Sequence, residues 1–257
     1  MTTRPGSAGS VLVLPKASRA YLVGETGTGK STLAEILALN YIKEYSKPKT
    51  PVRTLVIDTK PRFIAEHELN GFTTKQTGRY KKWGIGSDVF KGSFALARKG
   101  SIKSELDRVW ALGGNIAICH AEGAANWGYA SEVTRIFYES YGAKVPRLVF
   151  VDELADFYKY RSMGEIYERI ARNGRERNVS LIACSQRPRK VPTEVMTELK
   201  RLYMFQLSYK EDIKHIAEFG IPENTAMPEG HVFYMFDKEL RMRFPSNGYH
   251  ELELKNG

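Results

Sequence analysis

Cysteine is scarce in this sequence of 257 residues, which contains only Cys119 and Cys184. Both lie inside apolar runs. Two isolated cysteines supply neither a disulfide framework nor the paired spacing of a zinc site, and this excludes a disulfide-stapled protein and a zinc module. We interpret both as small core residues of a protein that folds in a reducing compartment.

Long apolar runs are absent as well. The polar N-terminus MTTRPGSAGS is followed by the run VLVL at Val11–Leu14, which is too short for a signal peptide. No stretch approaches the roughly 18 apolar residues that a membrane span requires. Internal repeats and low-complexity tracts are also missing. These absences predict a soluble, intracellular protein with no membrane span of its own.

Negative charge is in short supply: 29 Asp and Glu face 39 Lys and Arg, a formal net charge of +10. A basic balance of this size indicates a polyanionic partner, although it says nothing about the fold. With 42% hydrophobic and 26% charged residues, the chain has the composition of a globular protein. We therefore expect residues 1–257 to form a single domain.

Short apolar runs alternate along the chain with segments of helical length. Each run is brief, nearly continuous and rich in β-branched or large apolar residues, as in strands buried on both faces of a parallel sheet. The predicted strands are Ala20–Gly24, Thr54–Asp58, Asn115–Cys119, Arg147–Val151, Val179–Cys184 and Arg201–Leu207. The predicted helices are Ser31–Tyr45, Ser101–Leu112, Asn126–Tyr141, Met163–Asn173 and Lys210–Phe219. This order predicts an α/β fold with a mostly parallel sheet sandwiched by helices.

Two regions interrupt this alternation. Residues 60–103 hold ten Lys and Arg, three Asp and Glu and six glycines, with little periodicity, and we expect a basic insertion there. The tail His231–Phe244 reads as two strands around a polar turn at Asp237–Glu239. This pattern predicts a C-terminal hairpin over about residues 230–245.

The stretch Gly24–Ser31, GETGTGKS, matches the phosphate-loop pattern G-x-x-x-x-G-K-[ST] between a predicted strand and a predicted helix. Its glycines let backbone N–H groups turn toward phosphates, and the helix directs its positive N-terminal end at the same anion. Lys30 can reach the β- and γ-phosphates, and the Ser31 hydroxyl can bind Mg²⁺. The predicted nucleotide-binding residues are Gly24, Glu25, Thr26, Gly27, Thr28, Gly29, Lys30, Ser31 and Thr32.

A second acidic motif, RLVFVDE at Arg147–Glu153, ends an apolar strand in two carboxylates. This is a Walker B pattern, in which Asp152 holds the Mg²⁺ shell and Glu153 activates a water for attack on the γ-phosphate. The alternative is that the pair caps a following helix, Leu154–Tyr160.

The guanine motif N/T-K-x-D of GTPases is missing from the sequence. A small-molecule kinase, which transfers phosphate to a substrate, usually lacks a glutamate poised to activate water. The two motifs therefore favour Mg²⁺-dependent hydrolysis of ATP.

The stretch Ala171–Pro188, ARNGRERNVSLIACSQRP, places Gln186 at the tip of a predicted strand. If that strand lies beside the Walker B strand, the Gln186 amide arrives next to the γ-phosphate and can report its presence. Arg172, Arg175 and Arg177 crowd Gly174, the expected helix stop. They are either helix C-terminal cations favoured by the dipole or an arginine finger offered to a neighbouring subunit.

The segments GETGTGKST, LVIDTKPRF, LVFVDELADFY and ARNGRERNVSLIACSQRP together resemble the FtsK–HerA superfamily of DNA-pumping ATPases. The resemblance covers about residues 20–207, and its specific part is Arg175 followed by Gln186-Arg187-Pro188. It implies a RecA-like core, a homo-oligomeric ring of usually six subunits, ATP bound between neighbours and duplex DNA in the central channel. It also favours Arg175 as the finger, with Arg172 and Arg177 as alternatives.

Two further absences narrow the resemblance. The sequence has no membrane segment of the kind found in the chromosome-segregating members, and too few residues precede the phosphate loop for the N-terminal β-barrel of cellular HerA proteins. An ATPase core without these additions resembles the genome-packaging ATPases of tailless, membrane-containing viruses. That resemblance implies a location in the host cytoplasm or in the virion, with capsid or portal-vertex proteins as possible partners.

Two basic clusters are candidates for contact with duplex DNA. The first holds Lys75, Arg79, Lys81 and Lys82 among aromatic residues, and the second is Arg187, Arg189 and Lys190 after the Gln186 strand. Cations at these positions can meet phosphates, and a solvated basic face is the alternative. Asp58 and His120 also follow predicted strands. Asp58 either orients the site or caps a strand, and we interpret His120 as structural.

The expected function is therefore ATP-driven translocation of double-stranded DNA, most like viral genome packaging. A plasmid-transfer or DNA-processing ATPase of the same superfamily stays open, and so does an ATP-dependent switch or scaffold that does not move DNA. Glu153 and Arg175 argue against the switch, which needs no fast hydrolysis. Ring size, five or six subunits, and the direction of translocation are not fixed by the residues.

Overall fold

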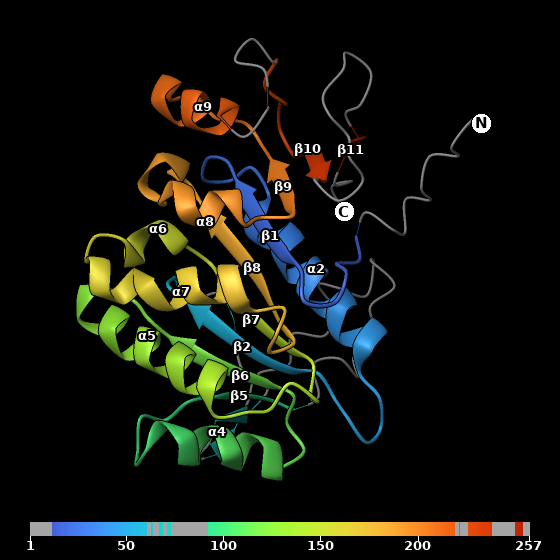
Figure 1. Ribbon diagram of the computed structural model, residues 1–257, viewed down its shortest axis with the longest axis vertical. Coiled ribbons are helices and arrows are strands. Elements are labelled where there is room, and N and C mark those ends of the chain that lie inside the picture. Colours follow the sequence, from blue (N-terminus) through green and yellow to red (C-terminus); the bar gives the residue numbers. More distant parts are fainter. Residues whose placement is uncertain are drawn as a thin grey trace.

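The computed structural model describes residues 12–60, 63, 67–68, 71–72, 92–218, 221, 226–237 and 250–253. Eleven strands form one sheet in the order β11-β10-β9-β1-β8-β7-β2-β6-β5-β3-β4 (Figure 1). The strands are β1 (Arg19–Val23), β2 (Arg53–Asp58), β3 (His67–Glu68), β4 (Gly71–Phe72), β5 (Ser93–Ala95), β6 (Ile116–His120), β7 (Arg147–Val151), β8 (Val179–Ser185), β9 (Arg201–Met204), β10 (Val232–Asp237) and β11 (His250–Glu253). The helices are α2 (Lys30–Tyr45), α4 (Ile102–Ala111), α5 (Ala124–Glu139), α6 (Leu154–Phe157), α7 (Arg161–Asn173), the 3₁₀ helix η2 (Pro188–Lys190), α8 (Thr193–Thr197) and α9 (Lys210–Ala217).

The centre of the sheet is parallel. Every pairing from β9 through β1, β8, β7, β2, β6 and β5 to β3 is parallel, whereas β4, β10 and β11 are added antiparallel at the two sides. The predicted α/β fold with a mostly parallel sheet is confirmed. Each of the six apolar runs in the sequence forms one of the strands β1, β2, β6, β7, β8 and β9.

Helices cover both faces of this sheet, and strand β1 shows how the sequence produces that arrangement. All five β1 residues are buried. Because successive side chains of a strand point to opposite faces, Tyr21 and Val23 join the core beneath α4 to α8. Ala20 and Leu22 join the core beneath α2. Figure 1 shows α5, α6 and α7 on one side of the sheet and α2 on the other.

The two interrupting regions contribute strands at the sides of the sheet. Strands β3, β4 and β5 fall within the predicted insertion, most of whose remaining residues lie outside the described part of the chain. Strand β10 ends at Asp237, where the hairpin turn is expected, and its described antiparallel partners are β9 and β11. The second strand expected before Phe244 falls among residues 238–249, which are not described. Within the described residues, no helix has the length and apolarity needed to cross a membrane.

Candidate active site

The loop between β1 and α2 is shaped by glycines and tied to the strands on either side of β1. Gly24 has a φ of +152°, and a Cβ at this position would come within 2.5 Å of Phe205 Cβ. Gly29 precedes α2 with a φ of +100°, in the left-handed region that favours glycine. The Gly24 N–H donates to Ser185 O at 3.3 Å, and the Glu25 N–H donates to Gln206 O at 2.9 Å. The phosphate loop is therefore anchored to β8 and to the chain that follows β9.

Lys30 is buried and folded back across this loop. Its Nζ donates to Glu25 O at 2.7 Å. Burial lowers the pKa of Lys30, while the thiol of Cys184 and the carboxylates of Glu153 and Asp152 oppose that shift. A cation held this close to the loop is well placed to contact any anion that the loop binds.

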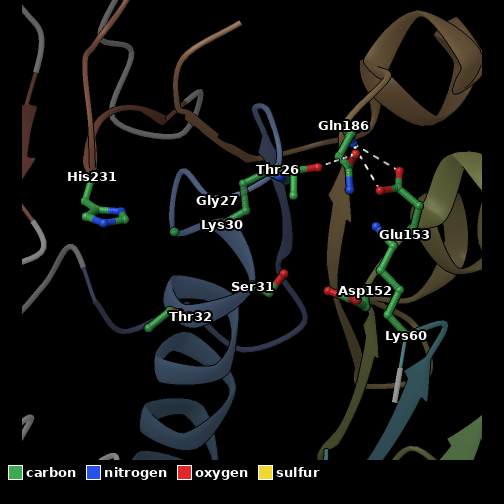
Figure 2. A pocket seen from close by; sticks show the side chains of 11 residues that line it. Thr26, Gly27, Lys30, Ser31, Thr32, Lys60, Asp152, Glu153, Gln186 and His231 are labelled. Carbon is green, nitrogen blue, oxygen red and sulfur yellow. Dashed lines mark hydrogen bonds between the residues drawn. The ribbon is translucent and has the colours of Figure 1, made fainter. Parts of the chain in front are cut away.

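Strand order brings the other predicted groups to the same end of the sheet. Strand β8 lies between β1 and β7, and β2 lies on the far side of β7. Since parallel strands end on one side, the groups that follow these four strands meet there. They enclose a cavity of about 340 Å³ (Figure 2). It is lined by Thr26, Gly27, Gly29, Lys30, Ser31, Thr32, Lys60, Asp152, Glu153, Gln186 and His231.

Glu153 is buried and held by the tip of β8. The Ser185 hydroxyl donates to Glu153 Oε1 at 2.7 Å, and the Gln186 N–H donates to the two carboxylate oxygens at 3.1 and 3.3 Å. Burial raises the pKa of Glu153, and these hydrogen bonds together with the charge of Lys60 oppose the rise. Glu153 occupies the N-cap position of α6, yet its side chain makes no capping hydrogen bond. The carboxylate therefore points toward β8 and the cavity, and the capping alternative does not describe it.

Gln186 joins this carboxylate to the phosphate loop. Its backbone N–H reaches Glu153, and its side-chain Oε1 accepts a hydrogen bond from Thr26 Oγ1 at 2.9 Å (Figure 2). The condition on which the Gln186 hypothesis depends is met, because β8 pairs with β7 from Val179 to Ala183. An amide between the loop and the carboxylate can respond to whatever occupies the space between them.

Ser31 and Asp152 line the same cavity from α2 and from the end of β7. A hydroxyl and a carboxylate are hard oxygen ligands of the kind that Mg²⁺ takes when it also binds phosphates and water. The donor set therefore fits magnesium. No cluster of three or more His, Cys, Asp or Glu suited to a metal occurs among the residues that the structure describes.

Two residues of the cavity were not predicted from the sequence. Lys60 follows β2 by two residues and stands beside Asp152 and Glu153, whereas His231 precedes β10 and stands at the other end of the cavity (Figure 2). The position of Lys60 after a buried strand was an available signal. His231 carried none, because it arrives through pairing of strands far apart in the sequence.

The three arginines lie at the opposite, amino end of the sheet, in the last turn of α7 and the turn before β8. All three are exposed. The Arg177 guanidinium stands over the Tyr138 ring at 5.0 Å, while no described residue pairs with the side chain of Arg172 or Arg175. The seven residues of β8 span about 23 Å, so Arg175 cannot reach the cavity of its own chain.

Gly174 ends α7 as predicted, but by a different means. Its φ is −57°, so it does not adopt the left-handed conformation of a glycine C-cap. Glycine is required by space, since a Cβ would lie 2.5 Å from Ile170 O and 2.6 Å from Val179 O. The left-handed residue of this turn is Asn178, with a φ of +54°.

Buried Arg147 fixes the backbone around these arginines. Its guanidinium donates to the carbonyls of Phe137, Tyr138 and Arg177 at 2.8, 2.9 and 2.7 Å. Burial lowers the pKa of Arg147 to about 10. One side chain at the start of β7 therefore joins the end of α5 to the turn that carries Arg175.

The basic residues after Gln186 divide into two kinds. Arg187 forms an ion pair with buried Asp212 at 2.9 Å, and its guanidinium stacks over Tyr209 at 4.1 Å. Arg189 and Lys190 are exposed. Arg187 is thereby engaged with the chain around α9, while its two neighbours remain open to solvent. The other predicted DNA contacts, Lys75, Arg79, Lys81 and Lys82, lie outside the described residues.

No protein-family model and no curated protein matches the chain. Solved structures do. The DNA-packaging ATPase B204 of Sulfolobus turreted icosahedral virus matches with a TM-score of 0.57 and 13% identity over 95% of this chain and 100% of that chain. The genome-packaging NTPase B204 of Sulfolobus turreted icosahedral virus 2, in complex with AMPPCP, matches with a TM-score of 0.56 and 13% identity over 93% and 98% of the two chains.

A third match is the cytoplasmic domain of the Thermomonospora curvata type VII secretion ATPase EccC. Its TM-score is 0.50 at 14% identity, over 91% of this chain and 25% of that chain. At this level of identity the likeness concerns the fold. The predicted α/β fold is confirmed, since the chain shares its fold with these solved ATPase structures.

Proposed function

We propose that this protein is a Mg²⁺-dependent ATPase of the FtsK–HerA superfamily that translocates double-stranded DNA as a homo-oligomeric ring, with six subunits implied by the resemblance. The observation that carries the proposal is the meeting of the phosphate loop, Asp152, Glu153 and Gln186 around one cavity. They come from three separate segments of the chain, which follow β1, β7 and β8, and they meet where the phosphates of a bound nucleotide would lie.

In this proposal, different residues of the chain bind the phosphates, hold the metal ion, accept the proton and sense the γ-phosphate. Backbone N–H groups of residues 24–32 and the Lys30 amine bind the phosphates. Ser31 and Asp152 would hold Mg²⁺, which neutralises charge on the β- and γ-phosphates when bound. Glu153, oriented by Ser185 and the Gln186 N–H, accepts a proton from the attacking water. Gln186, hydrogen-bonded to Thr26, senses the γ-phosphate.

Completion of the site requires a neighbouring subunit. Arg175 is exposed, lies at the far end of the sheet from its own cavity and is the finger favoured by the motif resemblance. We propose that it acts on the nucleotide of the next subunit in the ring. Two adjacent subunits then share each site, as expected for a ring in which neighbouring subunits coordinate their ATP hydrolysis.

DNA is the proposed polyanionic partner because the chain carries a net charge of +10 and folds like a protein described as a DNA-packaging ATPase. Exposed Arg189 and Lys190 follow the sensor residue Gln186, so they connect the nucleotide site with a surface that can meet phosphates. Lys75, Arg79, Lys81 and Lys82 remain proposed contacts. The biological role that this likeness favours is viral genome packaging, in the host cytoplasm or the virion.

The test is ATP hydrolysis by the purified chain with Mg²⁺, with and without duplex DNA of several sequences. Duplex DNA should raise the rate without sequence preference, since cations contact phosphates. Lys30→Ala should abolish nucleotide binding. Glu153→Gln should keep binding and lose about 10²–10⁴ in turnover. The control Glu44→Gln, at an exposed glutamate outside the cavity, should hydrolyse ATP at the parent rate.

The outcomes separate the parts of the proposal. Parental turnover by Glu153→Gln would contradict the assignment of the base. Hydrolysis that no duplex stimulates, with ring assembly intact, would favour an ATP-dependent switch or scaffold over a translocase.

A further inference from the structure

We propose that Lys60 is a second catalytic cation, which contacts the γ-phosphate from the side opposite Lys30. The inference rests on the proposed ATPase function and assigns a role to a residue outside the phosphate-loop and Walker B motifs. Lys60 lines the cavity together with Asp152, Glu153 and Gln186. Figure 2 shows its side chain running past Asp152 toward Glu153 and Gln186.

The position of Lys60 is fixed by strand pairing. Strand β2 runs parallel to β7, with Ile57 opposite Val151. The Asp152 N–H donates to Ile57 O at 3.1 Å, so the two chains stay paired as they leave the sheet. Lys60 therefore leaves the sheet beside the two carboxylates.

The turn that carries Lys60 is held down on both sides of it. Asp58 is fully buried, and its Oδ2 accepts a hydrogen bond from the Phe63 N–H at 3.0 Å and lies 3.3 Å from His120 Nδ1. The Phe63 ring packs edge-on against Phe150 of β7 at 5.4 Å. The Asp58 carboxylate therefore ties the chain after β2 to Phe63 and β6, which is a structural role, and its role in orienting the site stays a hypothesis.

Within the described part of the chain, the Lys60 amine makes no hydrogen bond, ion pair or ring contact, and its charge acts on Glu153 and Lys30 across the cavity. Lys30, by contrast, is buried and bonded to Glu25 O. Two carboxylates, Asp152 and Glu153, face the same space. A γ-phosphate that enters between them meets repulsion, and an amine aimed into that gap offsets it. Lys60 is exposed enough to adjust to the anion that arrives.

A cation at this position acts on the terminal phosphate alone, and this makes the proposal testable. ADP lacks the group that Lys60 would contact, so only triphosphate binding and hydrolysis depend on it. A hydrogen bond to a charged group contributes about 1.5–3 kcal/mol, which corresponds to a factor of about 10–150 in affinity.

The experiment compares Lys60→Met, Lys60→Arg and the control Lys49→Met. Lys49 is an exposed lysine outside the cavity, so its replacement removes the same charge. Dissociation constants for ATPγS and ADP are measured with Mg²⁺, together with kcat for ATP. Lys60→Met should lose about 10-fold or more in ATPγS affinity and in kcat while its ADP affinity stays within about 2-fold of the parent. Lys60→Arg should retain most of both, and Lys49→Met should match the parent.

A Lys60→Met variant that binds ATPγS and turns over ATP like the parent would overturn this inference and leave the proposed function standing. Equal losses for ATPγS and ADP would also overturn it, since they would show a general effect on the cavity. A parent chain that binds no nucleotide would overturn the proposed function itself. Melting temperatures of the variants separate these results from unfolding.

Discussion

The two ends of the parallel sheet are built differently. At the carboxyl end, two buried charged groups bond to neutral partners around a cavity: Lys30 to the Glu25 carbonyl, and Glu153 to the Ser185 hydroxyl and the Gln186 N–H. At the amino end, the buried guanidinium of Arg147 donates hydrogen bonds to backbone carbonyls, and the three arginines near it are exposed to solvent. One end encloses a cavity, whereas the other presents exposed cations.

The proposed shared site would give this difference a function. The cavity at the carboxyl end is lined by the phosphate loop, Asp152 and Glu153, and the exposed arginines lie at the amino end. In the proposed ring, the amino end of one copy would meet the carboxyl end of the next.

The largest effect on stability is expected at the amino end of the sheet, when the buried side chain of Arg147 is replaced. Arg147→Met leaves three carbonyl acceptors without their donor, and each unsatisfied buried group costs about 1–3 kcal/mol. Unfolding by urea should show a loss of about 3 kcal/mol or more. Arg177→Met, which removes only an exposed guanidinium stacked on Tyr138, should lose less than about 1 kcal/mol. Equal stability of the two variants would contradict the anchoring role.

A smaller effect is expected at the carboxyl end, where Ser185 orients Glu153. Ser185→Ala removes the 2.7 Å hydrogen bond to the carboxylate while leaving the Gln186 N–H in place. We expect kcat to fall about 10-fold, the equivalent of one hydrogen bond to a charged group, with KM for ATP little changed. Ser185→Cys has a side chain of similar size with a weak donor, so its kcat should lie between that of the parent and that of Ser185→Ala. A change confined to KM would show that Ser185 acts on binding and not on the base.

The smallest effect is expected for the salt dependence of DNA binding, when the exposed cations after Gln186 are replaced. Replacing Arg189 and Lys190 with glutamine should reduce the slope of log affinity for duplex DNA against log salt by about 2, since each phosphate contact contributes about 0.9. Arg187→Gln should instead disturb the pair with Asp212 and uncouple hydrolysis from DNA. An unchanged slope for the double variant would place the DNA contacts among Lys75, Arg79, Lys81 and Lys82.

Sequence reasoning succeeded where one stretch of chain carries the whole signal. The continuous apolar runs identified the central strands, because strands buried on both faces have no polar side to display. The phosphate loop and the pair Asp152-Glu153 were visible for the same reason, since each is a local motif at a strand end.

What the sequence did not reveal depends on contacts between distant segments. Lys60 lies at the cavity because β2 pairs with β7, and Arg187 forms an ion pair with Asp212 of α9. The role of Gly174 depended on carbonyls of Ile170 and Val179 that only the fold brings together. The pairing of β10 with β11 joins strands separated by 12 residues that the structure does not describe.

The most direct test of the composite site mixes two defective subunits. Arg175→Ala and Glu153→Gln damage opposite ends of the sheet, so a ring containing both has some interfaces at which Glu153 and Arg175 are intact. An arginine finger contributes about 10³–10⁵ in rate, so recovery should stand far above either variant alone. We predict that ATPase activity returns in the mixture once mixed rings are shown to form. Mixed rings that stay at the activity of the single variants would contradict the shared site.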